Sequence, residues 1–321
     1  MSRMTERTPT AERSIDTRDA TVTCPCGSTQ VLDLGRCREL SRTPDTQSAP
    51  DPGRLYRCRK CRLLFRAPAL STFDAEALYE SISGDEWQYD AWDSSAWILA
   101  HRRLQLRTPG DLLDIGSFDG QFLAQAPPGW RRAAIEPNPG AVAHLQQQGI
   151  DAIQGVLNDD VCSRLQGKFD VVAMFDVFEH LHDPLHGLRL AAACLRPGGA
   201  LYLSTGNADH WTWRLLGSEH PYLATEQHLV VGGETWFRDT CRSQQWQPPR
   251  MTRISHKTAR GLSRVRAAEL AVYFGARRRP WPYRGLASVL HKLPGCHHRL
   301  HRRYMPHIDQ LQDHLFVEIT P

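Results

Sequence analysis

The sequence lacks the long apolar run that a membrane-spanning helix needs, and its first residues, Met1 to Arg7, contain no apolar leader core. Both absences favour a cytoplasmic protein. The nine cysteines cannot all pair, since their number is odd, and the chain is long for a small disulfide scaffold. A secreted disulfide-rich protein is therefore disfavoured as well. The composition is 41% hydrophobic and 23% charged, which is ordinary for a globular chain of one large domain or of a core domain with a small companion.

Acidic residues are scarce in one part of the chain. The net charge is only +4, yet the segment from Lys257 to Arg303 holds about a dozen basic residues against one acid, Glu269. The remainder must therefore be net acidic. A basic patch of this kind favours anionic partners, namely a phosphorylated substrate, a membrane surface or a nucleic acid.

The glycine pattern of a dinucleotide site is also missing. The segment Leu112–Gly120 is typical of a strand that ends at a ligand, followed by a glycine-containing turn and a helix start. A pyrophosphate requires glycine where Phe118 stands, and Asp114 and Asp119 would repel it. S-adenosylmethionine (SAM), which has no phosphate and carries cationic groups, suits these acids. About twenty residues on, Glu136 ends a second strand at the spacing at which a carboxylate binds ribose hydroxyls.

From about residue 91 onward, predicted strands and helices alternate. This alternation favours an α/β fold with a doubly wound, mostly parallel sheet. Strands are expected at 111–115, 132–136, 152–155, 170–175, 200–205, 250–255 and 315–320. Helices are expected at 91–106, 120–125, 140–148, 185–195 and 234–245. We expect the helix over 185–195 to stop at the glycines of Arg196-Pro197-Gly198-Gly199.

Four cysteines near the N-terminus form two pairs. Cys58 and Cys61 have the usual C-x-x-C spacing of a zinc site, whereas Cys24 and Cys26 are one residue too close. Either the closer pair binds with some strain, or Cys37 takes part instead, or the thiols are free. A closed site of four thiolates would have a structural role, since it leaves no open position for chemistry.

The motif D-x-G-x-x-D-G over Asp114–Gly120, followed by Ile135-Glu136-Pro137, resembles that of class I SAM-dependent methyltransferases. Its Ser-Phe-Asp form is similar to a subgroup with an N-terminal zinc-binding segment that includes sugar C-methyltransferases, over roughly residues 22–245. The resemblance implies a seven-stranded sheet whose last two strands are antiparallel. It also implies a zinc-binding segment at 21–68 and a methyltransferase domain at 69–321 with a basic insertion at 257–307. Residues 1–20 are polar and have no apolar period, so we expect them to form a disordered tail.

The same resemblance implies a set of cofactor-binding residues. They belong to the loop after the first strand, the end of the second strand and the tip of the fourth. They are Asp114, Gly116, Ser117, Gly120, Glu136, Pro137, Asn138, Phe175 and Asp176. Residues 155–158 would lie near the adenine, with the usual acid displaced to Asp159 or Asp160.

Transfer of a methyl group to oxygen or carbon also needs a base. His228 lies in a segment, 221–229, that is similar to the one supplying the base in the zinc-containing sugar C-methyltransferases. Gln227 stands where those enzymes have a glutamate, and Thr225 lies near the position of their tyrosine. His228 is therefore the first candidate base and His180 the second, with a structural role as the alternative for each.

These observations favour a methyltransferase acting on a small molecule, such as a sugar, free or nucleotide-linked, or a natural-product intermediate. The chain has no room for the further C-terminal domain of the sugar C-methyltransferases, so oxygen is as good a candidate acceptor atom as carbon. One alternative is an RNA methyltransferase with a zinc module, although the fourth strand lacks the tip that clamps a flipped base. Another is a non-catalytic membrane-surface or assembly protein that uses segment 257–307.

Overall fold

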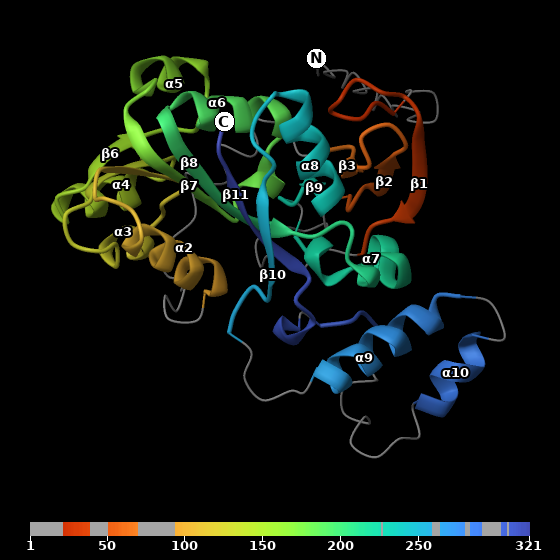
Figure 1. Cartoon of the computed structure of the whole chain (residues 1–321). Coiled ribbons are helices and arrows are strands. Elements are labelled where there is room, and N and C mark those ends of the chain that lie inside the picture. The colour runs from red at the N-terminus through yellow and green to blue at the C-terminus, as the bar shows by residue number, and fades with distance from the viewer. Residues whose placement is uncertain are drawn as a thin grey trace, which may run out of the picture.

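The computed structural model describes residues 22–38, 51–69, 94–225, 227–258, 264–279, 283–290, 303–306 and 308–321. Its centre is a seven-stranded sheet of order β10–β11–β8–β7–β4–β5–β6 (Figure 1). The strands are β4 (Asp111–Ile115), β5 (Arg131–Glu136), β6 (Asp151–Gln154), β7 (Phe169–Phe175), β8 (Leu195–Gly206), β10 (Arg250–Ile254) and β11 (His314–Ile319). The tail expected at 1–20 lies outside the described residues.

The strand directions confirm a mostly parallel sheet. Neighbouring strands from β6 to β8 pair in parallel, whereas β11 is antiparallel to both β8 and β10. The chain order reverses between β4 and β7, which creates a switch point where the loops after the strands diverge. A ligand is expected at that point, beyond the carboxyl ends of the strands.

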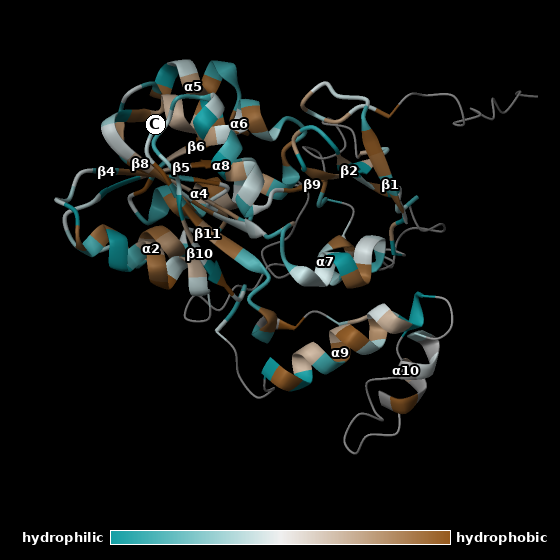
Figure 2. Ribbon diagram, turned by 45° about the vertical axis from the view of Figure 1, so that its right-hand side comes forward, coloured by the Kyte–Doolittle hydropathy of each residue, from teal (hydrophilic) through white to brown (hydrophobic). Residues whose placement is uncertain are grey.

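Helices cover both faces of the sheet because its strands are apolar on both sides (Figures 1 and 2). Successive residues such as Leu112 and Leu113 belong to opposite cores. One face packs against α2 (Ser95–Gln105), α3 (Gln121–Ala124) and α4 (Pro139–Gln147). The other packs against α5 (Asp159–Leu165), α6 (Pro184–Ala193) and α8 (Glu234–Ser243).

One expected helix end is wrong. Helix α6 ends at Ala193, and the segment expected to terminate it lies inside β8. The reason is a bulge: Leu195 pairs with Phe169 and Ala200 with Val171, so the intervening residues of β8 loop out. Gly198 takes a left-handed conformation there, with φ +80°. The two glycines therefore shape a strand and do not stop a helix.

The N-terminal cysteine module (residues 22–38 and 51–69) forms a four-stranded sheet together with one strand of the core domain. It contributes β1 (Val31–Arg36), β2 (Arg54–Cys58) and β3 (Leu64–Ala67), and the fourth strand is β9 (Val230–Val231) from the core domain. Cys24, Cys58 and Phe65 share one apolar cluster with residues of α6 and α8. The module is thus packed into the larger domain.

Two helices lie between β10 and β11 in the chain, within the segment expected to be an insertion. Helices α9 (Arg264–Arg277) and α10 (Tyr283–Leu290) contact each other, and α9 also contacts α7 (Trp211–Leu216). The insertion has its own apolar cluster around Leu270 and Phe274, and Figure 1 shows it projecting away from the sheet. Among the described helices, none combines the length and the apolar character required to cross a bilayer.

Candidate active site

A pocket of about 440 Å³ lies at the switch point. The loops after β4, β5, β6 and β7 line it, together with α6 and Trp97 of α2. Its volume is within the range of small-molecule sites, and most of its lining is apolar with a few acids and histidines. The fold therefore provides a ligand site where its topology predicts one.

The loop between β4 and α3 approaches the pocket through its backbone. Gly116 has φ +74°, and a Cβ there would lie 2.6 Å from a methyl group of Val177. Phe118 is also left-handed, with φ +46°, a conformation that costs energy for a side-chain-bearing residue. Strain of this kind persists only where the surroundings hold it in place, and here it lies on the pocket wall.

Glu136 is held at the end of β5 by two backbone amides. The N–H of Phe118 donates to its Oε2 at 2.8 Å, and the N–H of Asn138 donates to its Oε1 at 2.9 Å. Burial raises the pKa of Glu136, while these two donors oppose the rise. The carboxylate is thus oriented toward the pocket and keeps lone pairs for ligand hydroxyls.

Asp114 has no such pair of donors. Burial raises its pKa to about 8, the Glu136 charge adds to the rise, and the nearby Ser117 side chain opposes it. Ser117 is itself buried and lines the same wall. A buried acid beside a hydroxyl fits a ligand that brings a cationic group and hydrogen-bonding atoms, as the amino-acid part of SAM does.

The tip of β7 carries another acid, Asp176, in a strained backbone conformation. Asp176 has φ +53° and accepts hydrogen bonds from His256, at 3.0 Å, and from the Ser204 hydroxyl, at 3.2 Å. Burial alone would raise its pKa, but His256 and the other groups around it lower the pKa to about 2. Asp176 therefore stays ionised at the pocket floor.

Two neutral imidazoles lie side by side next to the pocket. Their ring centres are 5.1 Å apart, and His180 lies on the pocket wall. Nδ1 of His180 faces the Gln227 carbonyl at 3.0 Å, and Nδ1 of His228 faces the Tyr222 carbonyl. Since a carbonyl can only accept, each Nδ1 carries the proton, and Nε2 is the acceptor atom of each ring.

Burial keeps both imidazoles uncharged. It lowers the pKa of His180 to about 4 and that of His228 well below the ordinary value. Glu179 lies beside them, and burial raises its pKa to about 7 while Tyr222 donates a hydrogen bond to it. One ligand atom from each of Glu179, His180 and His228 lies within 4.8 Å of the others. Three acceptor groups thus converge on one point, an arrangement that suits a hydroxyl donor and is also of the kind that binds a divalent cation.

The structure gathers most of the predicted cofactor residues on the pocket wall. Those that line it are Asp114, Gly116, Ser117, Glu136, Pro137, Phe175 and Asp176. Two others support the wall without lining it: Gly120 begins α3 with φ +75°, and the Asn138 side chain caps α4 by accepting from Ala141 N. Of the candidate bases, His180 lines the pocket, and His228 lies next to His180 with 5.1 Å between the ring centres.

Several wall residues were missed by the sequence reasoning, namely Trp97, Leu181, His182, Asp183 and His186. They come from α2 and from the region leading into α6, whose positions relative to the loops depend on the packing of the whole sheet. Within the sequence, only their closeness to the candidate base His180 could have indicated Leu181, His182, Asp183 and His186.

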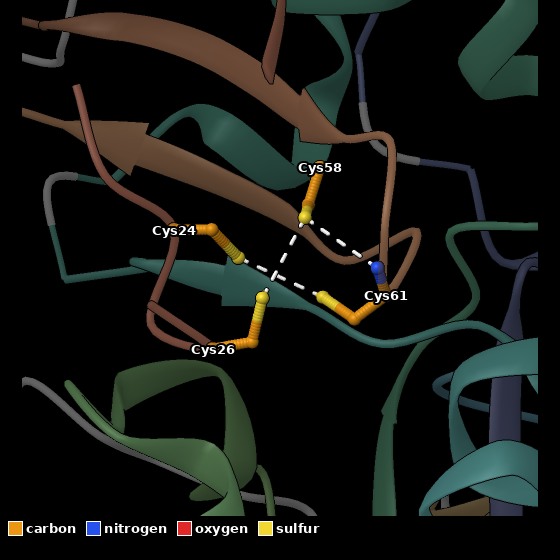
Figure 3. Close-up of side chains that lie close together, drawn as sticks. All are labelled: Cys24, Cys26, Cys58 and Cys61. Atoms are coloured by element: carbon orange, nitrogen blue, oxygen red, sulfur yellow. Dashed lines mark hydrogen bonds between the residues drawn. The ribbon is translucent and has the colours of Figure 1, made fainter. Parts of the chain in front are cut away.

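The four cysteines of the N-terminal module converge as well (Figure 3). The sulfur atoms of Cys24 and Cys61 are 3.6 Å apart, as are those of Cys26 and Cys58, and no two of the four are farther apart than 4.8 Å. All four are free thiols, and the Cys61 N–H points to the Cys58 sulfur at 3.4 Å. Cys37 belongs to a different apolar cluster. The donor set and its spacing fit a tetrahedral thiolate metal site.

Comparisons with known proteins found relatives by sequence and by structure. The ubiquinone biosynthesis O-methyltransferase of Xanthomonas campestris pv. campestris is 33% identical over 136 residues, which cover 40% of this chain and 55% of that protein. The corresponding protein of Escherichia coli O9:H4 is 32% identical over 90 residues, covering 27% of this chain and 37% of that protein. The chain thus spans about half the length, or less, of these relatives.

Solved structures that the chain matches include a SAM-dependent methyltransferase from Thermotoga maritima, with 14% identity, a TM-score of 0.40, and coverage of 70% of this chain and 92% of that one. Another, from Archaeoglobus fulgidus, has 12% identity, a TM-score of 0.43, and coverage of 70% and 94%. A family model described as a methyltransferase domain matches residues 89–264, more than half of the chain. With that match and a sheet of the expected topology, the chain belongs to the methyltransferase-domain family.

Proposed function

We propose that the protein is a SAM-dependent methyltransferase that methylates a hydroxyl oxygen of a small molecule. The observation that carries this proposal is the pocket itself, in which buried acids suited to a cationic cofactor adjoin imidazoles that can accept a proton. The names of the relatives, both O-methyltransferases, favour oxygen over carbon. The resemblance of the His228 segment favours a sugar, free or nucleotide-linked, or a natural-product intermediate as the substrate.

The residues divide into two groups by their proposed roles. Glu136 binds the ribose hydroxyls, because its carboxylate is fixed by two amides and has lone pairs left. Asp114 and Ser117 bind the amino-acid part of the cofactor, whose charge would stabilise the ionised form of Asp114. When bound, SAM supplies an electrophilic methyl group.

The second group acts on the acceptor. An imidazole Nε2 would accept the proton of the acceptor hydroxyl as its oxygen bonds to the methyl carbon, whose bond to sulfur would break and release S-adenosylhomocysteine. His228 is the proposed base, and His180, which lies beside it and lines the pocket, is the second candidate. The backbone carbonyls that hold each Nδ1–H fix the tautomer in which Nε2 is the basic nitrogen.

The test uses the purified chain, methyl-labelled SAM and a small-molecule extract of its host cells. We expect label in a compound whose new methyl group is bound to oxygen, as determined by mass spectrometry and NMR. Label on carbon or nitrogen would contradict the proposed acceptor atom. Protein that transfers no label to any component would contradict the proposed activity.

Glu136→Gln tests the cofactor site separately. The change keeps the volume but removes the charge, and it turns an amide group toward either the Phe118 or the Asn138 N–H. We expect S-adenosylhomocysteine to bind roughly 10- to 100-fold more weakly by calorimetry, the size of one or two charged hydrogen bonds. Asp239→Asn, on the exposed side of α8, is the matched control and should bind normally. Equal affinity of the two variants for S-adenosylhomocysteine would show that Glu136 does not bind the cofactor.

We also propose that Cys24, Cys26, Cys58 and Cys61 bind a structural zinc ion, which would make the chain a member of the zinc-containing subgroup. The spacing of the sulfur atoms supports this. The ion would stabilise a module with a small core of its own. With four thiolates around it, the ion would have no open position, and so no part in the methyl transfer.

A further inference from the structure

We propose that Arg66, in the N-terminal cysteine module, is a positioning residue for the candidate base His228. The inference rests on the proposed function, since it concerns how that base is held. It assigns to the module a role in the reaction although the module lies outside the family match at 89–264.

Strand β3 of the module holds the backbone next to His228. Leu64 and Phe65 pair with Val231 and Val230 of β9, and the Arg66 N–H donates to the Leu229 carbonyl at 2.8 Å. On its other side, the Leu229 N–H donates to the Glu179 carbonyl at 2.8 Å. The residue after His228 is therefore held between the module and the turn that carries His180.

The Arg66 side chain holds the other end of the same segment. Its guanidinium donates to the Leu223 carbonyl at 3.0 Å, and the residue is only 4% exposed. Leu223 directly follows Tyr222, whose carbonyl accepts the Nδ1–H of His228. One arginine thus bonds to both ends of the short segment that contains the base and the carbonyl that fixes its tautomer.

A buried guanidinium is well suited to this task. A charged donor in a low-dielectric setting makes a stronger bond to a carbonyl than a neutral donor does. Its planar group is rigid, so the position of the Leu223 carbonyl is closely defined. Without this bond, the Leu223 carbonyl would lose its charged donor, and the neighbouring Tyr222 carbonyl, which orients the His228 imidazole, would be held less firmly. A base displaced by a fraction of an ångström loses much of its effect on the rate.

The experiment compares Arg66→Met with Arg57→Met. Arg57 is the matched control, because its guanidinium also leaves the module to donate to a core carbonyl, that of Ala208 at 3.3 Å, but not in the base segment. We expect R66M to lower kcat by about 10- to 100-fold, the value of one charged hydrogen bond, with the affinity for S-adenosylhomocysteine within about twofold of wild type. R57M should leave both values near wild type, and R66K, which restores a charged donor, should recover part of kcat.

A double-mutant cycle decides whether Arg66 acts through His228. If it does, R66M should cause little further loss of kcat in an H228A background, while its effect should persist in an H180A background. Equal losses with and without His228 would overturn the inference. So would a kcat for R66M equal to that of R57M, or a loss of cofactor affinity as large as the loss of kcat.

A readout that needs no turnover separates this inference from the proposed function. In the wild-type protein, NMR of the His228 ring nitrogens should show a single Nδ1–H tautomer, and R66M should show a mixture. If R66M does not fold, R66K should show the shift in part. An unchanged tautomer would contradict the role of Arg66 even if the enzyme is active, whereas a wild-type protein without methyl transfer but with the expected tautomers would contradict only the function.

Discussion

Removal of one cluster cysteine offers the sharpest test of the metal site. Cys26→Ala should abolish stoichiometric zinc binding, whereas Cys37→Ala should leave one zinc ion per chain. The two residues make a matched pair, because both are cysteines of the same module. Cys37 is 4% exposed and lies in a separate apolar cluster, so its loss costs packing but no ligand.

The expected stoichiometry follows from the geometry. Four thiolates at about 2.3 Å from a tetrahedral ion would lie about 3.8 Å apart. The observed distances of 3.6 Å in two pairs are close to this, so one ion fits with little movement. The short spacing between Cys24 and Cys26 is accommodated because each of them faces one cysteine of the other pair, Cys24 facing Cys61 and Cys26 facing Cys58.

The assay is elemental analysis of protein purified without chelators from zinc-supplemented cells. We expect about one zinc ion per chain in the wild type and in C37A, and much less in C26A. Zinc content that is equal in C26A and C37A would refute the proposed ligand set. A wild-type protein without zinc would refute the site as a whole.

Two further predictions concern the cofactor loop. The pKa of Asp114 is about 8 in the native state and about 3.8 in the unfolded state. The free energy of unfolding should therefore decrease as the pH rises from about 3.8 to about 8, by at most about 1.4 kcal/mol per pH unit. Asp114→Asn should remove this part of the slope in thermal unfolding while abolishing cofactor binding, and an unchanged slope would contradict the buried acid. Gly116→Ala should weaken S-adenosylhomocysteine binding by at least about tenfold, because its Cβ would meet Val177 at 2.6 Å in a left-handed backbone; normal binding by calorimetry would show that the loop adapts.

The sequence predicted those features that depend on local chemistry. The strand and turn around Asp114 and the acid at Glu136 are specified by residues close together in the chain, and the structure brings them to one pocket. The bulge in β8 was missed because Gly198 can end a helix or kink a strand, and the choice depends on pairing with β7. Periodicity alone does not contain that pairing.

The surroundings of the candidate base were harder to predict because they combine distant segments. Arg66 and Leu229 are separated by more than half of the sequence, and a backbone hydrogen bond next to the β3–β9 pair connects them. Strand β9 has only two residues. A strand so short has no detectable period, so neither its existence nor its partner could be inferred. The proximity of His180 to His228 follows only once that pairing is known.

The cofactor half and the acceptor half of the site therefore depend on different parts of the fold. Glu136 and Asp114 end strands of the large sheet, whose cores on both faces hold them rigidly. The His228 segment depends on one short strand and on the N-terminal cysteine module. Damage to the module should therefore lower turnover before it lowers cofactor affinity, whereas damage to the large sheet should lower both together.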